Sequence, residues 1–178
     1  MEKFSYSELI DRLKRLDEEA SFTLTTADRC HVVIVGGSAL ILQKHLETST
    51  HDIDAISASR ELFSLLEKYD INTRVQAYIN NFPYNYEDRL VPIFTGRKVD
   101  YFTVSLEDIV VAKLYASRPQ DIIDISSEDV LNQIDWSLLE KLVVDSDEAR
   151  ASALNDQNYN SLLAAYASYA ERYKPCDN

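Results

Sequence analysis

Glycine, cysteine and basic residues are all scarce in this sequence. Its 178 residues include three glycines and two cysteines, and 18 basic residues stand against 30 acidic ones. Cys30 and Cys176 lie in unrelated segments, so they form no zinc or redox motif and indicate ordinary thiols in a reducing compartment. The net charge of −12 argues against a broad nucleic-acid-binding surface, because such a surface must neutralise many phosphates. Any contact with RNA is therefore expected to be local.

Long hydrophobic runs are also missing. No apolar segment reaches the length of a membrane span, and the acidic N-terminal region does not look like a signal peptide. We therefore expect a cytoplasmic protein with no membrane partner. The hydrophobic fraction of 46% is enough for a core. The length predicts one compact unit, in which a helical region over residues 105–178 completes a core formed by residues 1–104.

The hydrophobic pattern predicts an α/β (α+β) fold, with a mixed sheet flanked by helices and a C-terminal helical region. Ser5 and Glu8 have the spacing of a capping box and predict the start of the first helix. Thr95-Gly96-Arg97 separates two apolar arms and predicts a hairpin turn. Strands are predicted over residues 32–35, 52–56, 73–79, 90–94 and 98–104. Later helices are predicted over residues 38–46, 59–69, 106–116, 136–144 and 159–173, with short ones entered at 119 and 127.

The segment over residues 32–56 carries the main chemical signal. The apolar run 32–35 leads into Gly36-Gly37-Ser38, and a strand ending in such a turn lets backbone N–H groups approach a phosphate closely. A helix that begins near Ser38 adds the positive end of its dipole. Gly36, Gly37 and Ser38 are therefore the predicted phosphate-binding residues.

Two carboxylates follow this turn. Asp52 and Asp54 are separated by one residue, so on a strand they point to the same face. Two such charges repel each other, and a bound divalent cation removes the repulsion. Mg²⁺ is usually held by one or two carboxylates together with substrate phosphates. The pattern therefore predicts a magnesium site at Asp52 and Asp54.

These residues together resemble the polymerase-β-like nucleotidyltransferase superfamily. Its signature is a Gly-Gly or Gly-Ser turn, a helix, two alternate acidic residues on the next strand and a third on a later strand. Gly37, Ser38, Asp52 and Asp54 match this signature, and Asp100 fits the third position because it lies in an apolar strand. The resemblance implies a polymerase-β-type core in which Asp52, Asp54 and Asp100 are catalytic and bind Mg²⁺, as one ion or two.

A second block, residues 105–125, resembles the abortive-infection-type nucleotidyltransferases, which include toxins of type IV toxin–antitoxin pairs. Those proteins carry a Lys on a helix, then Arg, then Asp-x-x-Asp-Ile, and Lys113, Arg118, Asp121 and Asp124 follow this order. The resemblance implies that Lys113, Arg118 and Asp121 bind the nucleotide or its phosphates. It also implies a cognate antitoxin as a partner.

Without the resemblance, Lys113 has several interpretations. It shares a helical face with Ile109, Val110 and Leu114, which places an ammonium group in an apolar stripe. Such a group reaches solvent, pairs with a carboxylate such as Asp121 and so ties two helices together, or points toward a triphosphate. The sequence leaves these interpretations open.

The predicted activity is transfer of a nucleoside monophosphate from a nucleoside triphosphate to an acceptor, either tRNA or a protein, by a toxin-like enzyme. One alternative is a small-molecule nucleotidyltransferase of the aminoglycoside-modifying type, because an acidic cleft suits a cationic acceptor. Another is a non-catalytic module that binds nucleotide and a partner protein. Paired carboxylates that repel each other have no evident use in such a module.

Overall fold

The computed structural model describes residues 3–47, 51–144 and 146–176. The described strands form one five-stranded mixed sheet flanked by helices, which confirms the predicted α/β class. The strand order is β3 (Ile71–Asn72), β2 (Ile53–Ala58), β1 (Cys30–Val35), β5 (Val99–Thr103) and β4 (Val91–Thr95). The chain divides into two compact units. The first contains Met1–Tyr78 and Arg89–Val104, and the second contains Ile79–Asp88 and Ser105–Asn178.

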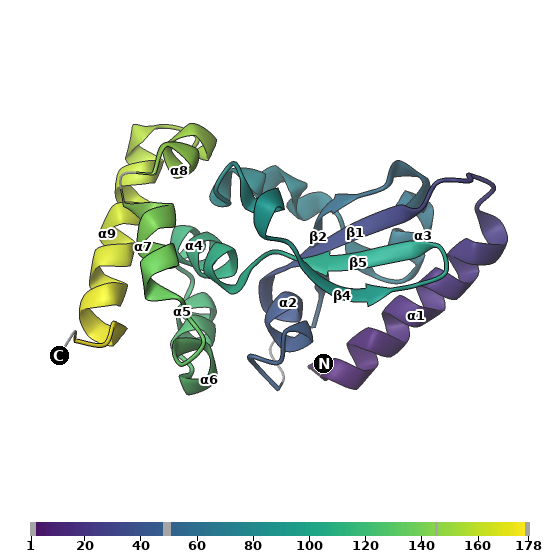
Figure 1. Ribbon diagram of the computed structural model, residues 1–178, viewed down its shortest axis with the longest axis horizontal. Coiled ribbons are helices and arrows are strands. Elements are labelled where there is room, and N and C mark those ends of the chain that lie inside the picture. The colour runs from purple at the N-terminus through teal and green to yellow at the C-terminus, as the bar shows by residue number, and fades with distance from the viewer. Residues whose placement is uncertain (1–2, 48–50, 145, 177–178) are drawn as a thin grey trace. The chain divides into compact units, whose positions relative to one another are not determined.

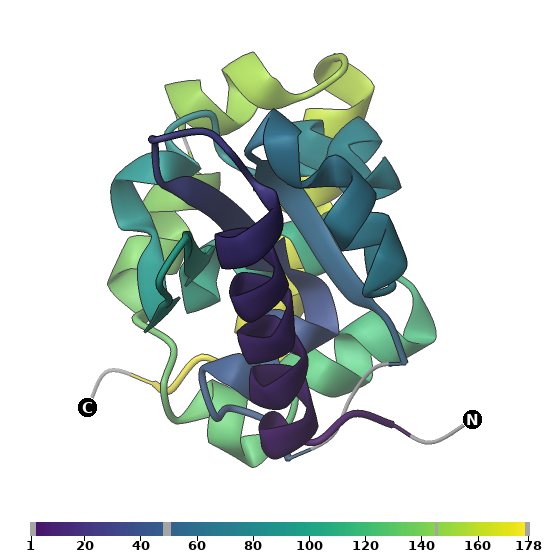
Figure 2. The ribbon, with the colours of Figure 1, turned by 90° about the vertical axis from the view of Figure 1, so that its right-hand side faces the viewer.

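Helix α1 (Tyr6–Thr23) lies along one face of the sheet in the first unit (Figure 1). Its predicted capping box is confirmed, because the Ser5 hydroxyl accepts the Glu8 N–H while the Glu8 carboxylate accepts the Ser5 N–H. Leu9 and Leu13 recur at helical spacing and are fully buried. Figure 2 shows α1 in front of the strands, and the phenol of Tyr101 donates to the Leu13 carbonyl at 2.9 Å.

The pairing of the strands places the ends of three of them side by side. β1 pairs with β2 in antiparallel and with β5 in parallel, and β2 pairs with β3 in parallel. The predicted hairpin at Gly96 is confirmed, since β4 and β5 are antiparallel and the Gly96 N–H donates to the Val99 carbonyl at 2.8 Å.

Three predicted elements are corrected. The strand expected over residues 73–79 is wrong, because β3 ends at Asn72 and a 3-10 helix, η2 (Arg74–Asn81), follows. The Asn72 side chain accepts the Arg74 N–H and so turns the chain out of the sheet. The helix expected over residues 38–46 is shorter and earlier, as α2 (Gly36–Leu42). The helix expected over residues 59–69 is divided into η1 (Arg60–Leu62) and α3 (Phe63–Lys68).

The second unit is helical from residue 105 onward, as predicted. Its helices are α4 (Leu106–Ala116), α5 (Pro119–Ile125), α6 (Glu128–Leu131), α7 (Trp136–Val143), α8 (Asp147–Ser152) and α9 (Asp156–Tyr173), after η3 (Tyr86–Arg89). Helix α8 was not predicted. Tyr159 and Tyr169 are buried, and their phenols donate to the carbonyls of Val143 and Ile125. Within the described part of the chain, no helix combines the length and the apolar character needed to cross a membrane.

Candidate functional site

Asp54 lies at the centre of the candidate site, on the second of three neighbouring strands. It is aligned with Val35 at the end of β1 and with Asn72 at the end of β3. Aligned residues of neighbouring strands point to the same face of a sheet. The carboxylate of Asp54 therefore has the glycine turn on one side and Asn72 on the other.

The glycine turn and Asp54 are brought together as the sequence predicts. Gly36 has a φ of +68°, in the left-handed region that favours glycine. A Cβ built on Gly36 would lie 3.6 Å from Oδ2 of Asp54, so the turn and this oxygen are in van der Waals range. The first N–H groups of a helix have no intrahelical acceptor, and α2 begins at Gly36. Backbone donors and a carboxylate oxygen thus lie next to each other.

Asn72 is a site residue that the sequence analysis missed. Its Nδ2 donates to Oδ1 of Asp54 at 2.9 Å, and its Oδ1 accepts the backbone N–H of Arg74 at 3.0 Å. The signal was present, because Asp70-Ile71-Asn72 repeats the polar, apolar, polar pattern of Asp52-Ile53-Asp54. A third strand that begins at residue 73, as the apolar pattern predicts, leaves Asn72 outside the sheet.

The other predicted residues of the turn and strand occupy different environments. Asp52 is exposed and lies just before β2, two residues from Asp54. Ser38 is buried, and its hydroxyl donates to the Val35 carbonyl at 3.0 Å, so this side chain closes the turn. Gly37 follows Gly36 in the first turn of α2. Since the Ser38 hydroxyl donates to Val35, the Ser38 group proposed for phosphate binding is its backbone N–H.

Asp100 does not join the other two aspartates. Asp100 on β5 is aligned with His31 of β1, whereas Asp54 on β2 is aligned with Val35 of β1. His31 precedes Val35 by four positions. At ~3.3 Å per residue, the two positions on the same face are offset by about 13 Å along the strands, and two strand spacings of ~4.8 Å across β1 add to this separation. Arg29 holds Asp100 there through two hydrogen bonds of 2.9 and 2.5 Å. These bonds lower the pKa of the Asp100 carboxyl although its partial burial opposes them.

Arg29 also explains why Asp100 stays at that end of the sheet. Its guanidinium donates to the carbonyls of Gly96 and Arg97 at 2.9 and 3.1 Å. One side chain thus ties the strand residue Asp100 to the β4–β5 turn. In this structure Asp100 has the contacts of a scaffold residue.

The donor set around Asp54 suits a hard cation. Oδ2 of Asp54 lies beside the glycine turn, and Asp52 precedes it by two residues in the chain, just outside β2. Carboxylate oxygens are the ligands that Mg²⁺ prefers, with substrate phosphates completing its shell. Among the described residues, no group of three or more His, Cys, Asp or Glu side chains is placed to hold a metal ion. A cation here would therefore depend on two carboxylates and the substrate.

The lysine predicted to bind phosphate is a buried member of an ion network in the second unit. Nζ of Lys113 on α4 lies 2.9 Å from Oδ1 of Asp121 and 2.8 Å from Oδ2 of Asp124, both on α5. Gln120 donates to the other oxygen of Asp124 at 2.7 Å. Since all three charged side chains are at most 8% exposed, the network ties α4 to α5.

Arg118 completes this network from its edge. Its Nε donates to Oδ2 of Asp121 at 2.6 Å, while the arginine side chain itself is 76% exposed. Burial disfavours the charged form of Asp121, yet the hydrogen bonds from Arg118 and Lys113 outweigh burial and lower its pKa. Arg118 is therefore both anchored and accessible to solvent.

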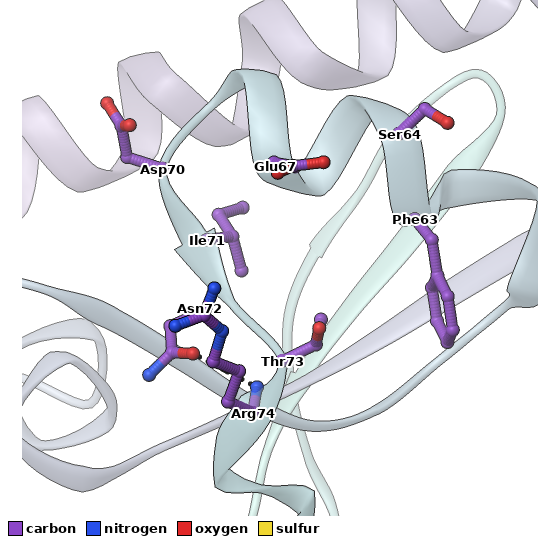
Figure 3. Close-up of a pocket in the computed structure, with 8 residues that line it drawn as sticks. All are labelled: Phe63, Ser64, Glu67, Asp70, Ile71, Asn72, Thr73 and Arg74. Atoms are coloured by element: carbon purple, nitrogen blue, oxygen red, sulfur yellow. Dashed lines mark hydrogen bonds between the residues drawn. The ribbon is translucent and has the colours of Figure 1, made fainter.

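A pocket of about 490 Å³ lies between α3 and the β3 segment, and we call it the α3–β3 pocket (Figure 3). Asn72 belongs both to its lining and to the Asp54 contact. Glu67 and Asp70 contribute carboxylates, and Arg74 contributes a guanidinium. The lining consists of Phe63, Ser64, Glu67, Asp70, Ile71, Asn72, Thr73 and Arg74.

Comparison with models of protein families gives a match over residues 11–174. That family is described as nucleotidyltransferase of unknown function (DUF6036). Neither the comparison with curated proteins nor the comparison with solved structures gives a match.

Proposed function

Because this chain belongs to the nucleotidyltransferase family of unknown function that spans residues 11–174, we propose that it transfers a nucleoside monophosphate from a nucleoside triphosphate to an acceptor, with Mg²⁺ as cofactor. The observation that carries this proposal is the position of Asp54. Its carboxylate lies between the glycine turn at Gly36 and the amide of Asn72. Backbone donors for phosphate and a carboxylate for a cation are two of the parts that nucleotidyl transfer uses.

Each residue of the site has a proposed task. Asp52 and Asp54 hold Mg²⁺, which when bound neutralises charge on the phosphates. The N–H groups of Gly36, Gly37 and Ser38 bind the phosphates of the leaving pyrophosphate. The acceptor oxygen attacks the α-phosphorus, and the bond from this phosphorus to the bridging oxygen breaks as pyrophosphate leaves.

The proton of the acceptor hydroxyl needs a base. Arg29 holds Asp100 away from Asp54, so we assign this task to the exposed carboxylate of Asp52 in place of Asp100. In the second unit we assign a scaffold role to Lys113 and Asp121, which hold Arg118, and anion binding to the exposed Arg118 guanidinium.

For the acceptor we propose tRNA or a protein, with the chain acting as the toxin of a toxin–antitoxin pair. The support is the order Lys113, Arg118, Asp121 and Asp124, which is similar to that of toxin-type nucleotidyltransferases. A small cationic acceptor of the aminoglycoside type is the second candidate. The net charge of −12 and the carboxylates of Glu67 and Asp70 in the α3–β3 pocket favour it.

The test is a transfer assay with each α-³²P-labelled nucleoside triphosphate and Mg²⁺. The acceptors are total tRNA, cell-extract protein and a panel of aminoglycosides, offered in separate reactions. We expect label on one acceptor class with the wild-type chain. The matched control is the Asp52→Asn, Asp54→Asn double variant, which keeps side-chain shape and removes both charges.

Equal labelling by the wild type and the double variant would contradict the proposal. Calorimetry separates the remaining alternative, the non-catalytic module. Tight binding of nucleotide with Mg²⁺, without transfer to any acceptor class, would assign the chain to that module.

A further inference from the structure

The amide of Asn72 has one orientation that its surroundings favour. Its Oδ1 accepts the Arg74 N–H at 3.0 Å, and its Nδ2 donates to Oδ1 of Asp54 at 2.9 Å. The reversed amide would set a donor against the Arg74 N–H and an oxygen against the carboxylate of Asp54. Two hydrogen bonds would become two repulsions. The N–H side of the amide therefore faces Asp54.

This orientation fixes what each oxygen of Asp54 does. Oδ1 receives the N–H of Asn72 on the β3 side. Oδ2 lies on the β1 side, 3.6 Å from the position of a Cβ on Gly36. Oδ2 is thus the oxygen of Asp54 that lies next to the turn proposed to bind phosphate, and Oδ1 is the oxygen that Asn72 occupies.

We infer that Asn72 is a positioning residue that limits the Asp54 site to a single Mg²⁺, an inference that rests on the proposed function. Sites with two ions hold them ~3.5–4 Å apart, so carboxylate oxygens must reach both ions. A second ion on the β3 side of Asp54 would meet the partly positive hydrogens of the Asn72 amide. Asn72 is the β3 residue aligned with Asp54, and it places an amide N–H beside this carboxylate. A second ion at that position would need an anionic oxygen instead.

The isosteric variant Asn72→Asp reverses this arrangement. It replaces the donor beside Asp54 with a second carboxylate, and the two like charges repel unless a cation lies between them. We therefore expect the variant to be less stable than the wild type without Mg²⁺ and to gain more stability from Mg²⁺. Thr73→Asp is the matched control, because it adds the same charge one residue later, in the α3–β3 pocket.

Two measurements test the inference without relying on activity. Electron paramagnetic resonance of free Mn²⁺ gives the number of ions bound per chain, and thermal unfolding with and without Mg²⁺ gives the cation-dependent shift in Tm. We expect one Mn²⁺ per wild-type chain and weaker binding by Asn72→Ala, by about tenfold or more, as is typical when the partner of a metal ligand is removed. The Mg²⁺-dependent shift in Tm should be larger for Asn72→Asp than for the wild type, and that of Thr73→Asp should equal the wild-type value.

Two Mn²⁺ ions per wild-type chain, or equal Mg²⁺-dependent shifts for Asn72→Asp and Thr73→Asp, would overturn the inference. Wild-type Mn²⁺ affinity in Asn72→Ala would do the same. The variant Asp54→Asn separates rejection of the role of Asn72 from rejection of the proposed function. If Asp54→Asn binds Mn²⁺ as tightly as the wild type, the metal site itself is misplaced. If it loses binding while Asn72→Ala keeps it, only the role of Asn72 is rejected.

Discussion

The carboxylate of Asp17 lies directly against Gly96: a Cβ built on this glycine would be 2.2 Å from Cγ of Asp17. The same carboxylate accepts the backbone N–H groups of Arg97, Lys98 and Val99, each at 2.8 Å. A buried side chain of α1 therefore holds the β4–β5 turn. Charge-assisted hydrogen bonds of this kind are stronger than neutral ones.

Gly96→Ala should destabilise the protein, because no real Cβ fits so close to the Asp17 carboxylate. We expect a loss of about 1–3 kcal/mol in the free energy of unfolding, measured by urea denaturation. In an Asp17→Ala background the obstructing carboxylate is gone, so the same glycine substitution should cost much less. Additive effects in this double-mutant cycle would show that the two residues do not interact.

Asp100→Asn should weaken the scaffold and spare the metal site. Hydrogen bonds from Arg29 lower the pKa of Asp100 below its ordinary value of 3.8. The Arg29–Asp100 pair therefore stabilises the fold above pH 3.8, and this stabilisation is lost as the pH falls through the lowered pKa. The variant should lose up to about 1 kcal/mol at pH 7, the range of an exposed pair, and little in strong acid. Loss of Mn²⁺ binding comparable to that of Asp54→Asn would instead place Asp100 in the metal site.

Lys113→Met should destabilise the protein strongly, because it leaves the carboxylates of Asp121 and Asp124 buried without their shared cation. Removing one partner of a buried ion pair costs about 3–5 kcal/mol. Adding Asp121→Asn and Asp124→Asn to the same chain should recover much of the loss, as chemical denaturation would report. A Lys113→Met protein as stable as the wild type would show that the network does not hold α4 to α5.

Glu107→Gln should stabilise the protein at neutral pH. Burial raises the pKa of Glu107, although its carboxylate accepts the Asp135 N–H at 2.9 Å. A carboxyl whose pKa is raised by folding contributes stability below its ordinary value of 4.5 and loses it as pH rises through the raised pKa. The neutral amide avoids this loss, so its Tm should exceed the wild-type Tm at pH 7 and approach it near pH 4. A lower Tm at pH 7 would contradict the assignment.

Gly36→Ala should damage the site more than the fold. Its φ of +68° is strained for alanine, at a cost of roughly 1–2 kcal/mol, while the added Cβ would lie at an ordinary contact distance of 3.6 Å from Asp54. Relief of the strain would move the backbone N–H groups proposed to bind phosphate. Nucleotide affinity measured by calorimetry should therefore fall at least tenfold in a protein that still unfolds cooperatively. Unchanged affinity would remove the glycine turn from the proposed site.

Local patterns in the sequence predicted most of the elements. The capping box at Ser5 and the hairpin at Gly96 are confirmed because caps and tight turns depend on residues close together in the chain. The strand expected over residues 73–79 is wrong because a hydrogen bond from the Arg74 N–H to the side chain of Asn72 ends the strand early. Apolar composition alone could not reveal that bond.

The candidate site was predicted in part. The proximity of the Gly36 turn to Asp54 follows from a strand, a short helix and a neighbouring strand, all within a short segment. The position of Asp100 depended on the register between β1 and β5 and on Arg29, a partner 71 residues away in the chain. Asn72 entered the site through the parallel pairing of β2 with β3.

By itself, then, the sequence determined the α/β class, the glycine turn and the two neighbouring aspartates, because short-range periodicity and turn chemistry act within a few residues. Only the tertiary structure decided which polar side chain meets Asp54, and which carboxylates are bound by Arg29 and by Lys113. The reason is physical: strand register and buried ion pairs join residues that are far apart in the chain, and their energies depend on burial and distance that exist only after folding.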